Sequence, residues 1–284
     1  MGEGNRAVVV GGGTMGTGIA SVLARAGIGV ELVEADEALA RAALERARAA
    51  IDDGVSRGRI EAADGETAKA RIGSVVGIDG CQRQPRLAIE AVPERAELKL
   101  EVLAEIEALE PRLLATNTSG ISIDQLATGL ADPSRFLGLH FFNPVPAMAL
   151  VEVVVGAATS EETREDAVAL VTEIGKEAVV VRDAPGFAST RLGIALGLEA
   201  IRMVEDGVAA AADIDRAMVL GYRHPVGPLR LTDIVGLDVR LDIARNLRDA
   251  YGDRFTPPPL LERMVAEGKL GKKSGEGFYP WDET

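Results

Sequence analysis

The sequence is poor in the residues that build disulfides and metal centres. Among its 284 residues it has one cysteine, Cys81, and two histidines, His140 and His224. A disulfide within the chain and a cysteine-based metal site are therefore excluded, and a multi-histidine zinc site is not expected. Cys81 is expected to be a small buried or half-buried residue without a reactive role.

Positive charge is also scarce. Lysine and arginine number 31 against 44 aspartates and glutamates, so the net charge is −13. Binding to nucleic acid and docking on anionic membranes depend on clustered basic side chains, so neither is expected. No apolar run approaches the ~18 residues of a membrane span, and the N-terminus lacks a signal-peptide pattern. We therefore expect a cytoplasmic protein.

Short apolar runs alternate with helical periods over the first two thirds of the chain. Expected strands are 6–10, 30–33, 87–92, 113–115, 136–140, 150–155 and 178–181. Expected helices are 19–26, 37–60, 95–109, 123–130 and 161–174, with a short one between 61 and 85. Such alternation predicts βαβ units in a mostly parallel sheet with helices on both faces, which is a doubly wound, Rossmann-type α/β fold.

The alternation ends at residues 183–186. Beyond them the sequence has only helical periods, at 187–206, 211–220, 229–250 and 260–267. The expected organisation is therefore a Rossmann domain at 1–184 and an all-α domain at 185–284.

A glycine turn follows the first expected strand. Gly11, Gly13 and Gly16 fit the dinucleotide fingerprint: the first allows a tight turn, the second lets pyrophosphate approach, and the third lets helix and strand pack closely. The helix N-terminus, with Thr14 and Met15, would face the phosphates with unpaired N–H groups. The sequence therefore predicts a nucleotide site, for which a generic nucleotide or flavin turn is the alternative.

Glu34 favours NAD as that nucleotide. It ends the second expected strand, about 20 residues beyond the glycines, where a carboxylate bonds the adenosine ribose hydroxyls. A carboxylate there repels a 2′-phosphate, so NAD is expected rather than NADP.

His140 and Glu152 form a candidate catalytic pair. His140 ends an expected strand, at the edge where ligands bind in open α/β sheets. Glu152 interrupts the aliphatic run 150–155, and a charge inside a buried parallel strand is costly unless it is paired. A carboxylate would orient the imidazole, which suits removal of a hydroxyl proton near pH 7. His224 has no such partner in view and is expected to be structural.

Seven segments carry distinctive patterns, in this order: 11–16 (GGGTMG), 90–94 (EAVPE), 117–122 (NTSGIS), 140–146 (HFFNPVP), 150–154 (LVEVV), 183–187 (DAPGF) and the tail 271–279 (GKKSGEGFY). Together they resemble the 3-hydroxyacyl-CoA dehydrogenases. The chain's short single-module length is similar to the 3-hydroxybutyryl-CoA dehydrogenase branch of that family. The resemblance implies a role in fatty acid metabolism.

The resemblance also implies residue roles. His140 and Glu152 would be the catalytic pair, and Ser119 would bind the substrate oxygen near the nicotinamide. The helical domain would cover the acyl group and form a homodimer. The positions implied to bind the cofactor are Glu94, Lys99, Asn117 and Asn143.

The sequence departs from the family pattern at three places. Thr190 stands where many members have asparagine, although its hydroxyl can still donate to a substrate carbonyl oxygen. Ala149 stands where a lysine is often found. A lysine that helps to hold CoA has no clear match in the second helix. Its role falls to one of four arginines, unless these only form a solvated face: Arg46, Arg48, Arg57 and Arg59.

The predicted activity is reversible, NAD-dependent oxidation of a 3-hydroxyacyl-CoA, such as 3-hydroxybutyryl-CoA, to the 3-oxoacyl-CoA. One alternative is a dehydrogenase of a non-CoA hydroxyacid or sugar acid on the same scaffold. A β-hydroxyacid dehydrogenase with an early lysine in its helical domain is disfavoured, because residues 187–198 contain none. A non-catalytic NAD(H)-binding sensor or structural protein would not need the His140–Glu152 pair.

Overall fold

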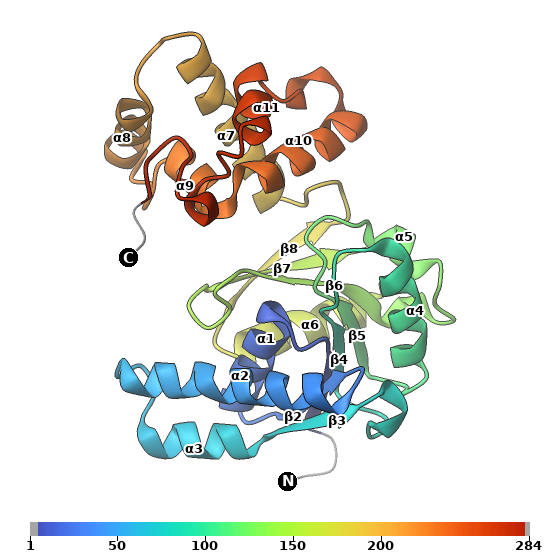
Figure 1. Ribbon diagram of the computed structural model, residues 1–284. Helices are drawn as coiled ribbons and strands as arrows, with labels where there is room; N and C mark the ends of the chain where they lie inside the picture. The colour runs from blue at the N-terminus through green and yellow to red at the C-terminus, as the bar shows by residue number, and fades with distance from the viewer. Residues whose placement is uncertain (1–4, 282–284) are drawn as a thin grey trace. The chain divides into compact units, whose positions relative to one another are not determined.

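The computed structural model of the protein describes residues 5–281 (Figure 1). The chain forms two compact units, Met1–Ala184 and Pro185–Thr284. Every strand of the described residues lies in the first unit. The second unit is built from helices.

One sheet of eight strands runs through the first unit in the order β3-β2-β1-β4-β5-β6-β7-β8. Neighbouring strands are parallel except β6 and β7, which are antiparallel. The order reverses between β1 and β4, which is where ligands bind in doubly wound folds. The strands are β1 (Arg6–Val10), β2 (Gly29–Glu34), β3 (Ile72–Val76), β4 (Leu87–Glu90), β5 (Leu113–Thr116), β6 (Phe136–Phe141), β7 (Leu150–Val155) and β8 (Glu177–Arg182).

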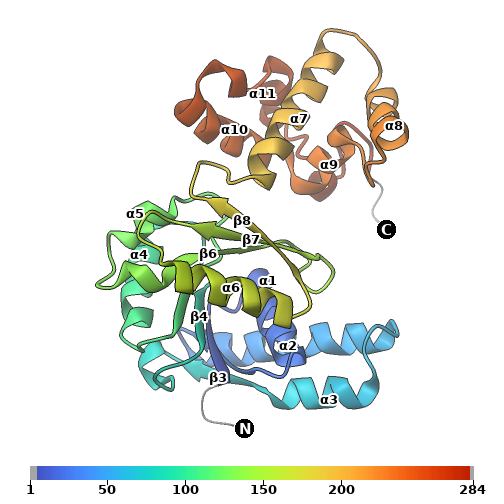
Figure 2. The same ribbon diagram turned by 180° about the vertical axis from the view of Figure 1, so that it is seen from behind.

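Helices cover both faces of this sheet, as Figures 1 and 2 show from opposite sides. Side chains of α1, α2 and α6 share one apolar core with the sheet, while α4 and α5 lie on the other face. This arrangement confirms the Rossmann-type fold. The helices are α1 (Thr14–Arg25), α2 (Glu37–Ser56), α3 (Ala62–Ala70), α4 (Ala96–Glu107), α5 (Ile123–Ala127) and α6 (Glu161–Glu173).

Three expectations for the first unit are corrected. The helix expected over 37–60 ends at Ser56, and β3 was not expected at all. β3 is an edge strand whose residues are mostly half-buried or exposed, and Gly73 and Ser74 interrupt its apolar pattern, so it lacks the signal of a buried strand. The sequence predicts a parallel strand over 150–155, but β7 runs parallel only to β8 and antiparallel to β6.

The second unit packs five helices around an apolar core that includes Ile194, Leu198, Ile201 and Leu241. One helix was expected over 229–250, but the chain breaks there into two. Gly236 separates them with φ +106°, a conformation that a residue inside a right-handed helix does not adopt. The helices are α7 (Ser189–Glu205), α8 (Ala211–Tyr222), α9 (Pro228–Val235), α10 (Leu237–Tyr251) and α11 (Pro259–Ala266).

A buried carboxylate on α9 holds the last described segment of the chain. Asp233 is 0% exposed and accepts hydrogen bonds of 2.9 Å from the backbone N–H groups of Phe278 and Tyr279 and from Nε1 of Trp281. Because a buried carboxylate is costly unless its oxygens accept hydrogen bonds, these contacts join the tail to the helical unit.

Replacing Asp233 tests this attachment. Asp233→Ala leaves three donors without their acceptor, so the free energy of unfolding is expected to fall by about 3 kcal/mol. Asp233→Asn keeps one acceptor oxygen and is expected to lose about half as much. Urea unfolding followed by the fluorescence of Trp281, the chain's single tryptophan, measures both. Unchanged stability of Asp233→Ala would contradict the attachment.

Candidate active site

The antiparallel pairing of β6 and β7 places His140 directly opposite Glu152. The imidazole Nδ1 lies 2.8 Å from Oε2 of the carboxylate. The two residues are 7% and 1% exposed, and the imidazole also packs on the ring of Phe142, with centroids 4.4 Å apart. Glu152 therefore receives the partner that a buried charge requires, and the orientation of the imidazole is set by a carboxylate behind it.

A cavity of about 320 Å³ opens in front of His140. It lies at the carboxyl ends of the strands, next to the glycine turn. Six of the predicted site residues line it together: Met15, Glu94, Asn117, Ser119, His140 and Asn143. Ala91, Val92, Phe141 and Phe142 complete its wall.

Glu94 holds the loop that follows β5 and carries Ser119, beside this cavity. Its Oε1 accepts hydrogen bonds from Thr118 Oγ1 at 2.5 Å and from the Ser119 backbone N–H at 2.8 Å. Ser119 Oγ lies 3.2 Å from the same oxygen. The carboxylate therefore fixes both the backbone and the hydroxyl of Ser119.

Lys99 on α4 is buried beneath this loop. It is 1% exposed, and its ammonium contacts Glu90 at 2.7 Å and Glu94 at 3.1 Å. Burial acts to raise the pKa of the Glu94 carboxyl, but the charge of Lys99 and the hydrogen bonds from Thr118 and Ser119 outweigh burial and hold that pKa below its usual value. Lys99 therefore reaches the cavity wall through Glu94.

We expect Lys99→Met to destabilise the protein by about 3–5 kcal/mol, because it leaves the buried carboxylate of Glu90 without its cation. Glu94 contributes stability above its unfolded pKa, and this contribution is lost as the pH falls through the lowered pKa. The difference between variant and wild type is thus expected to be full above about pH 4.5 and to narrow as the pH falls below that value.

Urea unfolding at several pH values measures this difference. Lys69→Met is the matched control, because Lys69 on α3 pairs with the exposed carboxylates of Asp52 and Glu66. Its replacement is expected to change the free energy of unfolding little. Equal losses for the two variants would contradict the buried network.

The glycine turn has the geometry that its sequence predicted. Gly11 has φ +100°, and a side chain there would meet the Ala91 carbonyl oxygen at 2.7 Å. A side chain on Gly16 would meet the Gly11 carbonyl oxygen at 1.8 Å. Gly13 faces open space within 4 Å and precedes α1 without a capping side chain. The turn can therefore admit a pyrophosphate at the helix N-terminus.

Glu34 and Arg46 both form hydrogen bonds to this turn. Glu34 Oε1 accepts from the Gly12 N–H at 2.6 Å, and Arg46 Nη2 on α2 donates to the Gly12 carbonyl oxygen at 2.8 Å. Arg46 therefore stabilises the glycine turn, whereas Arg57 pairs with Asp53 on the exposed surface.

Lys176, which the sequence did not predict, supports the loop between β6 and β7. The ammonium of Lys176 donates to the carbonyl oxygens of Val145 at 2.7 Å and Met148 at 2.6 Å. Burial, and then the charge of Arg25, lower its pKa. The loop carries Asn143, and Asn117 Oδ1 accepts from the Phe141 N–H at 3.0 Å at its start. No sequence pattern identified Lys176, because its partners are backbone carbonyls.

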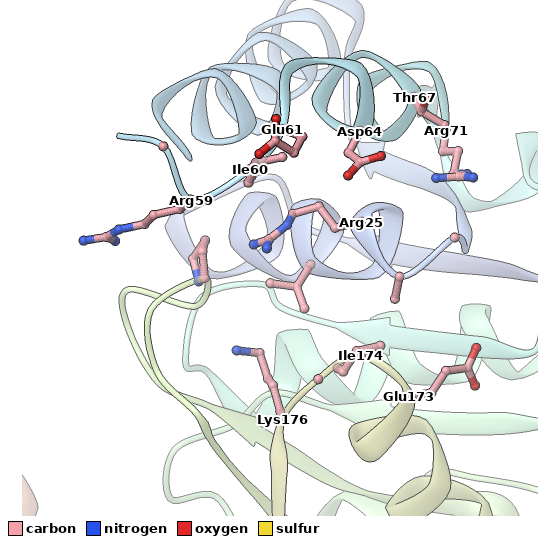
Figure 3. Close-up of a pocket in the computed structure, with 16 residues that line it drawn as sticks. Arg25, Arg59, Ile60, Glu61, Asp64, Thr67, Arg71, Glu173, Ile174 and Lys176 are labelled. Atoms are coloured by element: carbon pink, nitrogen blue, oxygen red, sulfur yellow. The ribbon is translucent and has the colours of Figure 1, made fainter. Parts of the chain in front are cut away.

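A larger cavity of about 780 Å³ lies elsewhere in the first unit (Figure 3). None of the predicted cofactor or catalytic residues lines it. Its wall combines the end of α1, the turn between α2 and α3, and the end of α6. Arg25, Arg59 and Lys176 line it together with Glu61 and Asp64. Its charges are mixed, so it does not by itself define a site.

The remaining predicted positions lie outside both cavities. Thr190 is the second residue of α7 in the helical unit and is half-buried. His224 is half-buried, with its ring 6.5 Å from that of Tyr222. Cys81 is buried as expected, and burial, with the nearby charges of Glu31 and Asp79, raises its pKa to about 12. A thiol with so high a pKa is a poor nucleophile.

Within residues 5–281 no helix is long and apolar enough to span a membrane. The same residues contain no cluster of histidine, cysteine and carboxylate side chains that could hold a metal ion.

A dinucleotide turn on a doubly wound sheet, with a His–Glu pair at its carboxyl edge, defines the class of NAD-dependent oxidoreductases. Comparison with known proteins agrees. Residues 6–184 match the profile of the 3-hydroxyacyl-CoA dehydrogenase NAD binding domain, and residues 186–281 match that of the 3-hydroxyacyl-CoA dehydrogenase C-terminal domain. The chain belongs to the 3-hydroxyacyl-CoA dehydrogenase family.

Relatives align over nearly the whole chain. A 3-hydroxybutyryl-CoA dehydrogenase of Mycobacterium tuberculosis is 42% identical, covering 97% of this chain and 98% of the relative. A probable 3-hydroxybutyryl-CoA dehydrogenase of Bacillus subtilis is 40% identical, covering 97% of each. The crystal structure of (S)-3-hydroxybutyryl-CoA dehydrogenase PaaH1 from Ralstonia eutropha has a TM-score of 0.93 at 35% identity and covers 99% of this chain and 100% of that one.

Proposed function

We propose that the protein oxidises a 3-hydroxyacyl-CoA, such as 3-hydroxybutyryl-CoA, to the 3-oxoacyl-CoA with NAD, reversibly. The observation that carries this proposal is the buried His140–Glu152 pair facing a cavity that Ser119 also lines. A sensor or structural protein that only binds NAD(H) does not need a buried carboxylate behind a histidine, because that arrangement serves proton transfer.

In this proposal His140 is the general base. Its Nδ1 contacts Glu152, so Nε2 is the nitrogen that takes the proton from the substrate hydroxyl. Glu152 stabilises the imidazolium that forms and keeps the ring in the required tautomer. In the reverse direction the same nitrogen returns the proton to the carbonyl oxygen.

The residues of the glycine turn fit an NAD molecule. Gly13 and the first N–H groups of α1, which belong to Thr14 and Met15, would face the pyrophosphate, and Glu34 would bond the adenosine ribose. Asn117, Asn143 and Glu94 would lie along the nicotinamide half, with Lys99 acting through Glu94. NAD, when bound, accepts the hydride that leaves the substrate carbon.

Ser119 and Thr190 would bind the substrate oxygens. Glu94 orients the Ser119 hydroxyl, which therefore starts from a fixed position and costs little reorganisation on binding. Thr190 lies in the helical unit, which we propose covers the acyl group. Arg57 and Arg59 are the arginines that we assign to the CoA phosphates. Arg46 donates to the glycine turn and Arg48 to the Ile72 carbonyl oxygen, whereas an exposed pair such as Arg57–Asp53 is weak and leaves Arg57 available.

The activity is tested by the loss of NADH absorbance with acetoacetyl-CoA and, in parallel, with acetoacetate. Turnover of the thioester alone is expected. Turnover of the free acid would support the hydroxyacid alternative instead, and NADH binding without any turnover would support the sensor alternative. His140→Ala is expected to lower kcat by about 100-fold or more while NADH binding persists.

Glu152→Gln is expected to lower kcat to a similar extent, because it keeps the shape of the pair but removes the charge that stabilises the imidazolium. His224→Ala is the matched control and should leave turnover unchanged. Normal turnover by His140→Ala would overturn its assignment as the base.

Glu34 generates a second test. Glu34→Gln retains an acceptor for the Gly12 N–H but loses the charge, so the preference for NADH over NADPH is expected to narrow by about tenfold or more. Glu34→Ala should also weaken binding of both cofactors, because the turn loses a hydrogen bond. The ratio of kcat/KM values for the two cofactors measures this. Glu37→Gln, an exposed neighbour, is the control, and an unchanged ratio in Glu34→Gln would remove Glu34 from the ribose.

We further propose a homodimer formed through the helical unit. In its favour, α8 exposes large apolar side chains: Leu220 is 68% and Tyr222 75% exposed. Such surfaces are typical of protein interfaces. A cytoplasmic location and a role in fatty acid metabolism complete the proposal.

A further inference from the structure

Ser119 lies at an exposed loop tip that side-chain packing does not hold. Within loop 117–122, Ser119 and Gly120 are both exposed, and a side chain on Gly120 would meet nothing within 4 Å. The position of the Ser119 hydroxyl therefore depends on hydrogen bonds at the two ends of the loop. Glu94 supplies those at the first end, where it accepts from Thr118 and Ser119.

Asp183 holds the other end of this loop. It follows β8, and its Oδ2 accepts a hydrogen bond of 2.6 Å from the Ser122 hydroxyl and one of 3.0 Å from the Asp124 backbone N–H. The Ser122 oxygen in turn caps α5 by accepting from the Gln125 N–H at 3.2 Å. Because the acceptor is a carboxylate, both bonds to Asp183 are stronger than bonds between neutral groups. They fix the first turn of α5, which begins just beyond Ser119.

The same two aspartates are anchored to β7, the strand that contributes the glutamate of the candidate catalytic pair. The Asp183 N–H donates to the Val155 carbonyl oxygen at 2.8 Å, at the end of β7. Asp124 Oδ1 accepts from the Ala157 N–H at 2.6 Å, just after the same strand. A continuous set of hydrogen bonds thus runs from the end of β7 through Asp183 to loop 117–122.

We propose that Asp183 is a positioning residue for the reaction. It holds loop 117–122 so that the Ser119 hydroxyl keeps a fixed distance from His140. The inference rests on the proposed function, which assigns the substrate oxygen to Ser119. His140 takes the proton from that same oxygen, so both side chains must lie within hydrogen-bond reach of one atom. A displacement of about 1 Å can cost about 100-fold in rate, and an exposed loop tip held at one end only is free to make it.

Replacing Asp183 tests this role with acetoacetyl-CoA and NADH. Asp183→Ala removes the acceptor of both bonds and is expected to lower kcat/KM for acetoacetyl-CoA by about tenfold or more, while the Kd of NADH stays unchanged. Asp183→Asn should restore most of the rate, because it keeps an acceptor oxygen for Ser122. Its amide nitrogen would take the place of Oδ1, which is buried and meets no donor within residues 5–281. Asp166→Ala removes a carboxylate that pairs with Arg112, and this matched control should behave like wild type.

A double-mutant cycle with Ser119→Ala separates positioning from a general loss of structure. If Asp183 acts through the Ser119 hydroxyl, Asp183→Ala should lower kcat/KM by less than about twofold once that hydroxyl is absent. A full further loss in the Ser119→Ala background would overturn the proposal, because the aspartate would then act elsewhere. Wild-type kcat/KM in Asp183→Ala would overturn it too, as would an equal loss in Asp183→Asn.

Ser122→Ala decides the matter even if Asp183→Ala fails to fold. It removes the hydroxyl donor and leaves the Asp124 N–H bonded to Asp183, so a smaller loss of about threefold is expected. This loss should also disappear in the Ser119→Ala background. Wild-type kcat/KM in Ser122→Ala would contradict the positioning role while leaving the dehydrogenase intact. Absence of turnover by the wild-type protein would overturn the proposed function, and the inference with it.

Discussion

The Glu152 carboxylate sits in the middle of a buried strand, and much of the candidate site follows from how its charge is compensated. A carboxylate that is 1% exposed needs a hydrogen-bonding partner. The antiparallel register of β6 and β7 supplies one by placing His140 directly across the strand pair. The reversal of β7 is therefore the topological feature that makes the pair, because a residue directly opposite on an adjacent strand lies within side-chain reach.

A second network of buried charges lies at the same edge of the sheet and joins the ends of β4 and β5 to α4. Glu90, at the end of β4, accepts from Lys99 on α4 at 2.7 Å and from Thr116 at the end of β5 at 2.6 Å. Lys99 continues to Glu94, which holds Ser119. Charged hydrogen bonds of this kind are stronger than neutral ones and directional. They fix the loops that follow β4 and β5.

The helical unit uses buried charge differently. Asp233 is fully satisfied by three donors from the tail, whereas Arg240 has no carboxylate partner within residues 5–281. The hydrogen-bonded carboxylate of Asp233 therefore stabilises the fold, whereas the buried guanidinium of Arg240 lowers its stability.

The Rossmann-type fold, the glycine turn, the helical character of the second unit and the residues of the His–Glu pair could be predicted from sequence, because each leaves a local signal in periodicity, spacing or an interrupted apolar run. Only the tertiary structure decided the direction of β7, the edge strand β3, the break at Gly236 and the partners of Lys99, Arg46, Lys176 and Arg240. These depend on which segments meet in space, and the same lysine or arginine fits a solvated helix face or a buried network equally well until its neighbours are known.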